Sequence, residues 1–243
     1  MAVLVTRPAS SGQQLCQQLV QAGVTAIHHP LLTILPGREL DRLLPLIKKA
    51  DLIIAVSQYA AHFADQTLAE TQHHWPTDVI YLAVGQKTAH VFSKATQQKV
   101  HYPQYSDSEH LLQLPQLEQV QNKTILILRG NGGRDLIHDT LAQRGGHVHY
   151  LEAYQRQLQP FNAKTSVMDW QSRHIDTVIV TSAEQLQFLF SQLPTKEQQW
   201  LLKQRLLVPS ARICVLAHQL GFRHVINMDS ASNNDIMKTL QLT

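Results

Sequence analysis

The sequence predicts an α/β protein with parallel sheets, and three observations carry that prediction. Short apolar runs rich in Val, Ile and Leu recur along the 243 residues, and an amphipathic stretch follows each of them. The runs lack a regular alternation of apolar and polar residues, as expected for strands that are covered on both faces. The order of runs and stretches also occurs twice, which indicates two copies of one α/β unit.

Ten runs have the length and composition of strands. In chain order they are residues 3–6, 25–29, 51–57, 79–85, 99–103, 124–130, 147–154, 176–182, 205–210 and 224–228. The stretches between them are predicted helices; the first, residues 10–24, has an N-cap expected at Ser10 or Ser11 and a C-terminal glycine at Gly23. Because parallel strands need a crossover between them, this alternation predicts parallel sheets.

The repeat consists of four matched pairs of segments in the same order. Residues 3–8 match 125–130, 51–57 match 176–182, 82–89 match 206–213 and 106–114 match 232–240, at offsets of 122, 125, 124 and 126 residues. Both members of the last pair begin with the Ser-x-x-Glu/Asp pattern of a capping box, at Ser106 and Ser232. The chain therefore carries two copies of a five-stranded unit.

Two arrangements of the copies remain open. They can form sequential domains with a boundary near residues 121–122, or the first strand–helix–strand can complete the sheet of the second copy, so that the chain crosses between domains twice. Residues 31–36 and 151–160 both continue as extended, Pro-terminated segments after a strand. Such segments suit a two-stranded linker, which favours the second arrangement.

Composition excludes several classes of protein. The 21 Lys and Arg against 18 Asp and Glu are dispersed, so no nucleic-acid partner is expected. No apolar run reaches the roughly 18 residues of a membrane span, and the N-terminus lacks a signal-peptide pattern. Cys16 and Cys214 lie far apart, which favours a reduced, cytoplasmic protein. The 14 histidines show no metal-ligand spacing, so no metal site is expected.

Polar residues collect where the predicted strands end, which is where open parallel sheets bind ligands. These residues are Thr6, Arg7, Ser57, Gln58, Gly85, Gln86, Arg129, Gly130, Asn131, Gly132, Gly133, Arg134, Thr181, Ser182 and Ser210. Any one hydroxyl among them can simply cap the next helix. Six strand ends of the same character favour an anion-binding cleft instead, because helix N-termini and arginines bind carboxylates or phosphates. The loop at 129–134 is neither a Walker A nor a GxGxxG motif, but its glycines let backbone amides approach an anion.

Seven segments, in one order along nearly the whole chain, carry a resemblance to a known family. They are VLVTRP (3–8), DLIIAVSQYAAHFA (51–64), AVGQKTA (83–89), LILRGNGGRDLI (126–137), LEAYQRQ (151–157), VIVTSAEQLQ (178–187) and LLVPSARICVLAHQLGF (206–222). Together they resemble uroporphyrinogen-III synthase, in its gammaproteobacterial branch.

The resemblance implies two flavodoxin-like domains, residues 1–34 plus 159–243 and residues 37–152, with linkers near 31–36 and 151–160. It implies a monomeric, cofactor-free enzyme that closes linear hydroxymethylbilane into uroporphyrinogen III, with inversion of ring D and loss of water. Hydroxymethylbilane synthase is the expected donor of the substrate. The eight carboxylates of the substrate suit the anion-binding strand ends.

The resemblance also implies roles for individual residues. Tyr154 matches the family's tyrosine, which is proposed to assist departure of the hydroxyl. The substrate-binding set is Arg7, Ser57, Gln58, Thr88, Arg129, Gly130, Asn131, Gly132, Arg134, Thr181, Ser182, Ser210 and Arg212. The chain departs from the family at two turns: Val56-Ser57 stands where many relatives have Thr-Ser, and residues 208–212 replace a Gly-Pro-x-Thr-like turn.

Two rival functions fit parts of the pattern. A two-lobed module that binds or senses a small anion shares the paired α/β units, although the chain shows neither a secretion signal nor a DNA-binding appendage. A nucleotide-dependent transferase needs a phosphate loop that this sequence lacks.

Overall fold

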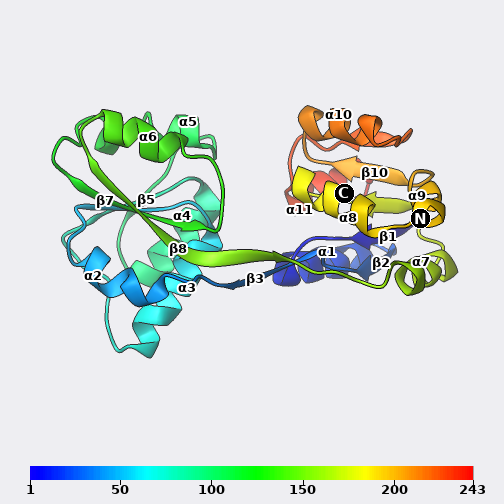
Figure 1. The fold of residues 1–243 in the computed structure, drawn as a ribbon, viewed down its shortest axis with the longest axis horizontal. Coiled ribbons are helices and arrows are strands. Elements are labelled where there is room, and N and C mark those ends of the chain that lie inside the picture. Colours follow the sequence, from blue (N-terminus) through cyan, green and yellow to red (C-terminus); the bar gives the residue numbers. More distant parts are fainter. Residues whose placement is uncertain (243) are drawn as a thin grey trace. The chain divides into compact units, whose positions relative to one another are not determined.

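The computed structural model describes residues 1–242 and places a strand at each of the ten predicted runs. The chain forms two compact units, one made of residues 1–33 and the segment from 157 onward, the other of residues 34–156 (Figure 1). The chain passes between the units twice, in β3 (Leu32–Pro36) and in β8 (His147–Leu158). The arrangement with two crossings is therefore the correct one. Within the described chain no helix has both the length and the apolar character needed to cross a membrane.

The first unit contains a five-stranded parallel sheet in the order β11-β10-β9-β1-β2. Its strands are β1 (Ala2–Val5), β2 (Thr25–His28), β9 (Thr177–Ile179), β10 (Arg205–Val208) and β11 (Val225–Asn227). Apolar side chains of α1 (Ala9–Gln21) and α11 (Asn233–Thr239) pack on one face. The other face is covered by α7 (Ala163–Ser172), α8 (Ala183–Gln192), α9 (Thr195–Leu201) and α10 (Ala211–Gln219).

The second unit contains a six-stranded sheet in the order β3-β8-β7-β4-β5-β6. Besides β3 and β8, its strands are β4 (Leu52–Ala55), β5 (Ile80–Ala83), β6 (Val100–His101) and β7 (Thr124–Gly130). Neighbouring strands from β8 through β7, β4 and β5 to β6 are parallel. Side chains of α2 (Leu43–Ile47), α3 (Gln58–Glu70) and α4 (Gln86–Thr96) pack on one face. The other face carries α5 (Ser108–Leu111) and α6 (Leu136–Gln143). Short 3₁₀ turns precede α2, at Leu40–Arg42, and follow α5, at Pro115–Leu117.

The two sheets share one topology once the repeat is taken into account. The order β2-β1-β9-β10-β11 in the first unit corresponds to β8-β7-β4-β5-β6 in the second. This is the flavodoxin-like order 2-1-3-4-5, with the switch point of the sheet between β1 and β9 in one unit and between β7 and β4 in the other. Apart from β3, which is an additional edge strand in the second unit, each unit thus joins two strands of one copy to three strands of the other.

The structure corrects three details of the repeat and its helix ends. The equivalent helix starts are Gly85 and Ser210, so residues 82–89 align with 207–214 and not with 206–213. Helix α1 has Pro8 as its N-cap, without a capping side chain, and not Ser10 or Ser11. Ser232 caps α11 as predicted, but α5 is capped by Asp107, which stands next to Ser106 and is an equally favourable N-cap residue.

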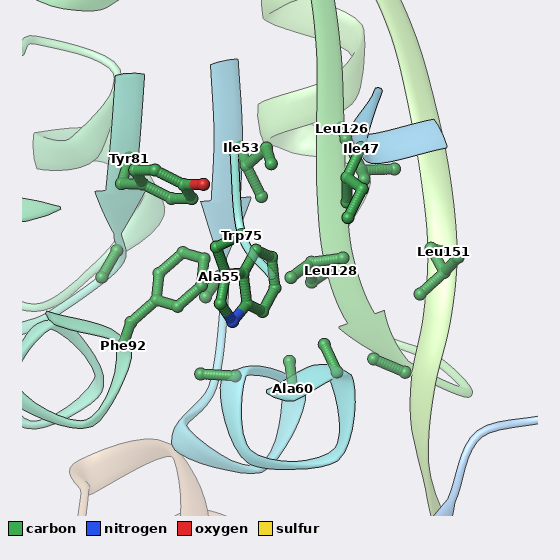
Figure 2. Close-up of a cluster of buried hydrophobic side chains, with 14 of the residues drawn as sticks. Ile47, Ile53, Ala55, Ala60, Trp75, Tyr81, Phe92, Leu126, Leu128 and Leu151 are labelled. Carbon is green, nitrogen blue, oxygen red and sulfur yellow. The ribbon is translucent and has the colours of Figure 1, made fainter. Parts of the chain in front are cut away.

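Three aromatic rings anchor the core of the second unit between the sheet and α4 (Figure 2). The buried ring of Phe92 lies edge-on to Trp75, at 5.2 Å between centroids, and to Tyr81, at 5.3 Å. The Tyr81 hydroxyl donates to the carbonyl of Pro76 at 2.7 Å, and the Trp75 indole donates to Asp65 at 3.0 Å. Both polar ends of the cluster are therefore hydrogen-bonded, and burial raises the pKa of Tyr81 well above its usual range.

We expect Phe92→Ala to lower the free energy of unfolding of the second unit by about 3–5 kcal/mol, because a buried phenyl ring leaves a cavity that its neighbours cannot fill. Hydrogen-exchange mass spectrometry in urea should show lost protection in peptides from residues 34–156 and little change in the first unit. Tyr102→Ala, at a position that is 43% exposed, is the control. Equal loss of protection in both units would contradict independent cores.

Candidate functional site

The structure gathers the predicted site residues at the carboxyl ends of the two sheets. In the second unit these are Ser57, Gln58, Thr88, Arg129, Gly130, Asn131, Gly132, Arg134 and Tyr154. In the first unit they are Arg7, Thr181, Ser182, Ser210 and Arg212. The turns at each switch point of the sheet belong to these sets, as expected for a ligand site of this topology.

Tyr154 owes its orientation to a bulge in β8. Arg129 pairs with Glu152 and Gly130 pairs with Tyr154, so Ala153 has no partner on β7. Strand alternation alone would place Tyr154 on the face of Tyr150, but the extra residue turns it to the opposite face, where it packs with Leu151 and Ala153. Bulges commonly re-aim a side chain near functional sites.

Gly130 leaves the space that the Tyr154 ring occupies. A Cβ atom built on Gly130 would lie 2.6 Å from Cζ of Tyr154 and 3.0 Å from its hydroxyl oxygen, so the absence of a side chain is required here. On its other side the ring lies 5.9 Å, between centroids, from the ring of Tyr59 in α3. The phenol is therefore held between the backbone of β7 and the start of a helix.

The turn at residues 37–39 holds the bulge from the other side of β8. The Gly37 amide donates to the carbonyl of Ala153 at 3.0 Å, and a Cβ on Gly37 would meet the Glu152 carbonyl oxygen at 1.8 Å. The Glu39 carboxylate accepts the Glu152 amide at 2.8 Å. The bulged backbone thus has hydrogen-bond partners where the ladder is interrupted.

Asn131 fastens the 129–134 loop to the end of β8. Its side-chain amide donates to the Arg156 carbonyl at 3.1 Å, and its oxygen accepts the Arg156 amide at 2.9 Å. Gly132 and Gly133 follow with φ of 155° and 132°, which favour glycine. Both polar ends of the Asn131 side chain are engaged, so in this structure Asn131 shapes the loop.

Arg129 is packed between an acid and an aromatic ring. Its guanidinium donates to Asp135 at 2.8 Å, lies 4.2 Å from the ring centroid of Tyr150 and has a side chain that is 13% exposed. The Tyr150 hydroxyl donates to the same Asp135 at 3.0 Å. Arg129 holds the pKa of Asp135 below its usual range, and the Tyr150 hydrogen bond adds to this shift.

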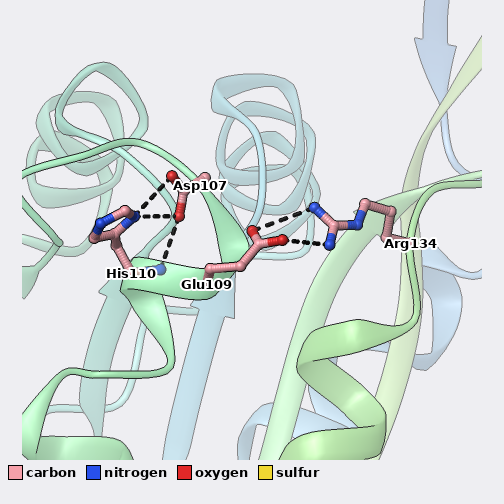
Figure 3. Close-up of polar contacts among 4 residues, drawn as sticks. All are labelled: Asp107, Glu109, His110 and Arg134. Carbon is pink, nitrogen blue, oxygen red and sulfur yellow. Dashed lines mark hydrogen bonds and ion pairs between the residues drawn. The ribbon is translucent and has the colours of Figure 1, made fainter.

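Arg134 forms a two-point ion pair with Glu109 of α5 (Figure 3). One Nη donates to Glu109 Oε2 at 3.2 Å and the other donates to Oε1. The pair lowers the pKa of Glu109, chiefly through these hydrogen bonds. The neighbouring Asp107 is engaged elsewhere, because its carboxylate accepts the His110 amide at 2.7 Å and contacts the His110 ring.

A cavity of about 160 Å³ opens between these elements within the second unit. Its apolar lining is Val56, Val84, Ile127 and Ile137, and its polar lining includes Ser108, Arg129, Arg134, Tyr150 and the backbone of Gly132 and Gly133. The predicted loop and two strand ends therefore line one pocket.

The predicted hydroxyl groups have different local roles. Ser57 caps α3 by accepting the Tyr59 amide at 3.2 Å, and Ser182 caps α8 by accepting the Gln185 amide at 3.2 Å. Accepting a bond leaves the O–H of each serine able to donate. The Thr181 hydroxyl, in contrast, donates to the Gln185 side chain at 3.1 Å, so its proton is already used.

The helices that carry Thr88 and Arg212, α4 and α10, both start without a capping side chain. Helix α4 begins after Gly85, and α10 begins after Ser210, whose hydroxyl makes no capping bond. Thr88 is half-buried in the first turn of α4, and Arg212 is exposed in the first turn of α10. Uncapped amide groups at a helix start attract anions.

Arg7 lies in the turn after β1. It donates to the Asn233 side chain of α11, and its carbonyl lies 2.9 Å from Nε2 of His28. A Cβ on Gly12 would lie 2.2 Å from that nitrogen, so Gly12 gives His28 its place beside the turn. Thr6 is buried and donates to the Ile179 carbonyl at 2.8 Å.

Several residues of this site are absent from the sequence prediction: Glu109, Asp135, Tyr150, Glu39 and His28. One signal was available, since Asp135 directly follows the arginine-containing loop and a buried arginine needs a counterion. The contacts of Glu39 and Glu109 join segments 25 or more positions apart, which a single sequence does not reveal. Among residues 1–242 no group of three or more His, Cys, Asp or Glu side chains is placed to hold a metal ion.

Comparisons with known proteins agree on one family. The family model described as uroporphyrinogen-III synthase HemD matches residues 13–237. The uroporphyrinogen-III synthase of Escherichia coli K12 is 42% identical over 99% of this chain and 100% of its own length. The uroporphyrinogen-III synthase of Salmonella typhimurium LT2 is 39% identical over 99% of this chain and 100% of its own length.

Solved structures of two uroporphyrinogen III synthases share the fold at 16% sequence identity. A mutant of the Thermus thermophilus enzyme matches with a TM-score of 0.66 over 100% of this chain and 98% of its own. The Helicobacter pylori 26695 protein matches with a TM-score of 0.62 over 100% of both chains. The predicted fold class is thereby confirmed.

The environment of Tyr150 predicts a measurable titration. Burial, and then the bond to Asp135, raise the pKa of Tyr150 to about 12. An unfolded tyrosine ionises at about pH 10, so the stability that comes from protonated Tyr150 is complete below pH 10 and is lost as the pH rises to about 12.

The difference in ultraviolet absorbance between the native chain and Tyr150→Phe should therefore show one ionisation near pH 12. Asp135→Asn should bring that ionisation to lower pH, because it removes the negative charge beside the phenol. Ionisation near pH 10 in a chain that circular dichroism shows to be folded would contradict the assignment.

Proposed function

The chain belongs to the uroporphyrinogen-III synthase family, and on that premise we propose how its residues carry out the family's reaction. The enzyme, a lyase of heme biosynthesis, closes hydroxymethylbilane into uroporphyrinogen III with inversion of ring D and loss of water. Similarity over the whole length of curated relatives at 42% identity is the observation that carries this function.

Each unit offers its own donors to the carboxylates of the substrate. In the second unit these are Arg129, Arg134, Thr88, the O–H of Ser57 and the turn at Gln58. In the first unit they are Arg7, Arg212, Ser210 and the O–H of Ser182. Support comes from the position of these groups at the carboxyl ends of the strands, and from the uncapped starts of α4 and α10.

Three members of the predicted set shape the loop and its surroundings. Gly130 makes room for Tyr154, the Asn131 side chain ties the loop to β8, and Gly132 lines the cavity without a side chain while its amide donates to the Gly130 carbonyl. Thr181 is the weakest substrate ligand of the set, because its proton is given to Gln185 and a carboxylate can accept only from a donor.

Tyr154 is the proposed catalytic residue. Its phenol hydrogen-bonds to the hydroxyl that leaves ring A and gives it a proton, so that the hydroxyl departs as water and leaves an azafulvene cation beside the phenolate. The phenolate recovers a proton when the final ring closure at ring D releases one. Ring D then attacks through its substituted carbon, and the resulting spiro-pyrrolenine fragments and recloses with ring D inverted. The pyrrole nitrogen supplies the electrons, so the protein's main task is to hold the correct conformer.

Isomer analysis tests the function directly. The chain is incubated with enzymatically generated hydroxymethylbilane, and the products are oxidised and separated by HPLC. We expect the inverted type III isomer. Spontaneous closure gives the uninverted type I isomer, so type I alone would overturn the activity and favour the rival module that binds or senses a small anion.

Three further expectations belong to this proposal. The chain acts as a monomer, receives its substrate from hydroxymethylbilane synthase and works in the cytoplasm, where its two free cysteines stay reduced. Sedimentation of the chain alone and with that synthase tests the first two. A dimer would contradict the first.

We also propose that the two units are folding domains with the boundaries 1–34 plus 159–243 and 37–152. Separate hydrophobic clusters in each unit support this division. Residues 37–152, expressed alone, should unfold cooperatively in urea. A fragment without a cooperative transition would contradict the boundaries.

We expect Tyr154→Phe to lower turnover by up to about 100-fold, since one positioned donor is lost and the leaving group is already labile. The melting temperature and the affinity for product should change little, because the ring remains. Gly130→Ala should give a similar loss of turnover by displacing that ring. Tyr102→Phe is the control. Full activity of Tyr154→Phe would remove the hydroxyl from the mechanism.

A further inference from the structure

We infer that the cavity at the carboxyl end of the second sheet is a subsite for one carboxylate-bearing side arm of the tetrapyrrole. Arg134 is the arginine that binds this arm, and Glu109 is paired with Arg134 until the ligand displaces it. This inference rests on the proposed function. It adds which part of the ligand enters the cavity, and that Glu109 competes with the ligand for Arg134. The cavity lies wholly within residues 34–156.

The size of the cavity suits a single side arm. A volume of about 160 Å³ holds the equivalent of about five water molecules. An acetate or propionate arm has four or five non-hydrogen atoms, whereas a whole pyrrole ring with its substituents is larger. The cavity therefore has room for one arm.

The lining also suits such an arm, because it is apolar on one side and cationic on the other. Val56, Val84, Ile127 and Ile137 present apolar surface to the methylene groups. Arg134 reaches the same pocket, and its planar guanidinium matches a carboxylate at two points. The backbone of Gly132 and Gly133 approaches without side chains.

The carboxylate that Arg134 would bind in a complex is replaced here by the side chain of Glu109. The contact uses both Nη atoms and both carboxylate oxygens, which is the geometry of carboxylate recognition (Figure 3). Both side chains are largely exposed, at 63% for Arg134 and 48% for Glu109, so the pair exchanges readily with a competing anion.

Arg134, rather than Arg129, is the arginine that can change partners. Arg129 is 13% exposed and is fixed by Asp135 and by the Tyr150 ring. The ion pair of Arg134 reaches instead across to another segment, α5. Exchange at Arg134 therefore leaves the loop's buried contacts in place.

A ligand has to displace Glu109, so removing its charge should strengthen binding. We expect Glu109→Gln to bind uroporphyrinogen III about 1.5- to 5-fold more tightly, the range that corresponds to an exposed ion pair. Arg134→Ala should weaken binding, and the double variant should bind like Arg134→Ala alone. Calorimetric titration under anaerobic conditions measures all three affinities.

Glu118→Gln is the matched control, because it removes the same charge from an exposed position of the same unit. Unchanged or weaker binding by Glu109→Gln, or a gain that persists without Arg134, would overturn the subsite. If the unsubstituted chain still forms the type III isomer in that case, the proposed function stands without the subsite. Tighter binding by Glu109→Gln, with no type III product from the unsubstituted chain, would instead overturn the function and keep the subsite.

Discussion

The pairing of β7 with β8, and the single unpaired residue within it, determines the rest of the second unit's carboxyl edge. Ala153 interrupts the ladder, and the interruption turns Tyr154 onto the face that α3 covers. This turn is possible only because Gly130 offers no Cβ at the point of closest approach. The next residue along the chain, Asn131, then binds the backbone of Arg156 on both sides. One register shift thus places a phenol, shapes a loop and ends a strand.

The same edge shows how two arginines are accommodated in the folded chain. Removing a guanidinium from water is unfavourable unless a counterion and hydrogen bonds replace the solvent. Arg129, the less exposed of the two loop arginines, has a carboxylate and an aromatic face as partners. Arg134 is more exposed and is paired with an exposed carboxylate. The two arginines therefore differ in burial: Arg129 supports the loop from inside, whereas Arg134 lies in solvent with an exposed partner.

The sequence predicts the strands, the repeat and the location of the polar residues well, because each depends on local patterns. Apolar runs of strand length report burial on both faces, and polar residues at their ends report the turn that follows. The helix N-caps were less predictable: Pro8 and Asp107 begin α1 and α5, where neighbouring serines are equally reasonable candidates. At α5 the choice goes with a local contact, because the Asp107 carboxylate accepts the amide of His110 and also contacts its ring, three residues along the chain.

The orientation of Tyr154 could not be predicted, because it depends on contacts between segments that are far apart in sequence. A period of two in β8 assigns it to the face of Tyr150 and Glu152, and only the contacts of residues 37–39 with the strand explain the bulge. The pairing of Arg134 with Glu109 also joins two separate segments, 25 positions apart. The pattern of a strand reveals which faces are covered, but an interruption of the ladder is decided by segments far away in sequence.

The repeat makes the two carboxyl edges equivalent in topology but not in chemistry. At the offset of 122 residues, Gly130 corresponds to Pro8 and Tyr154 corresponds to Leu32, which is buried and carries no polar side-chain atom. The first unit therefore has neither the glycine that admits a ring nor the ring itself. What its edge retains is Arg7, Arg212 and the uncapped start of α10, which are cationic or electropositive groups without a phenol. Divergence between the copies has left the phenol on the unit in which the ladder is bulged, and arginines on both.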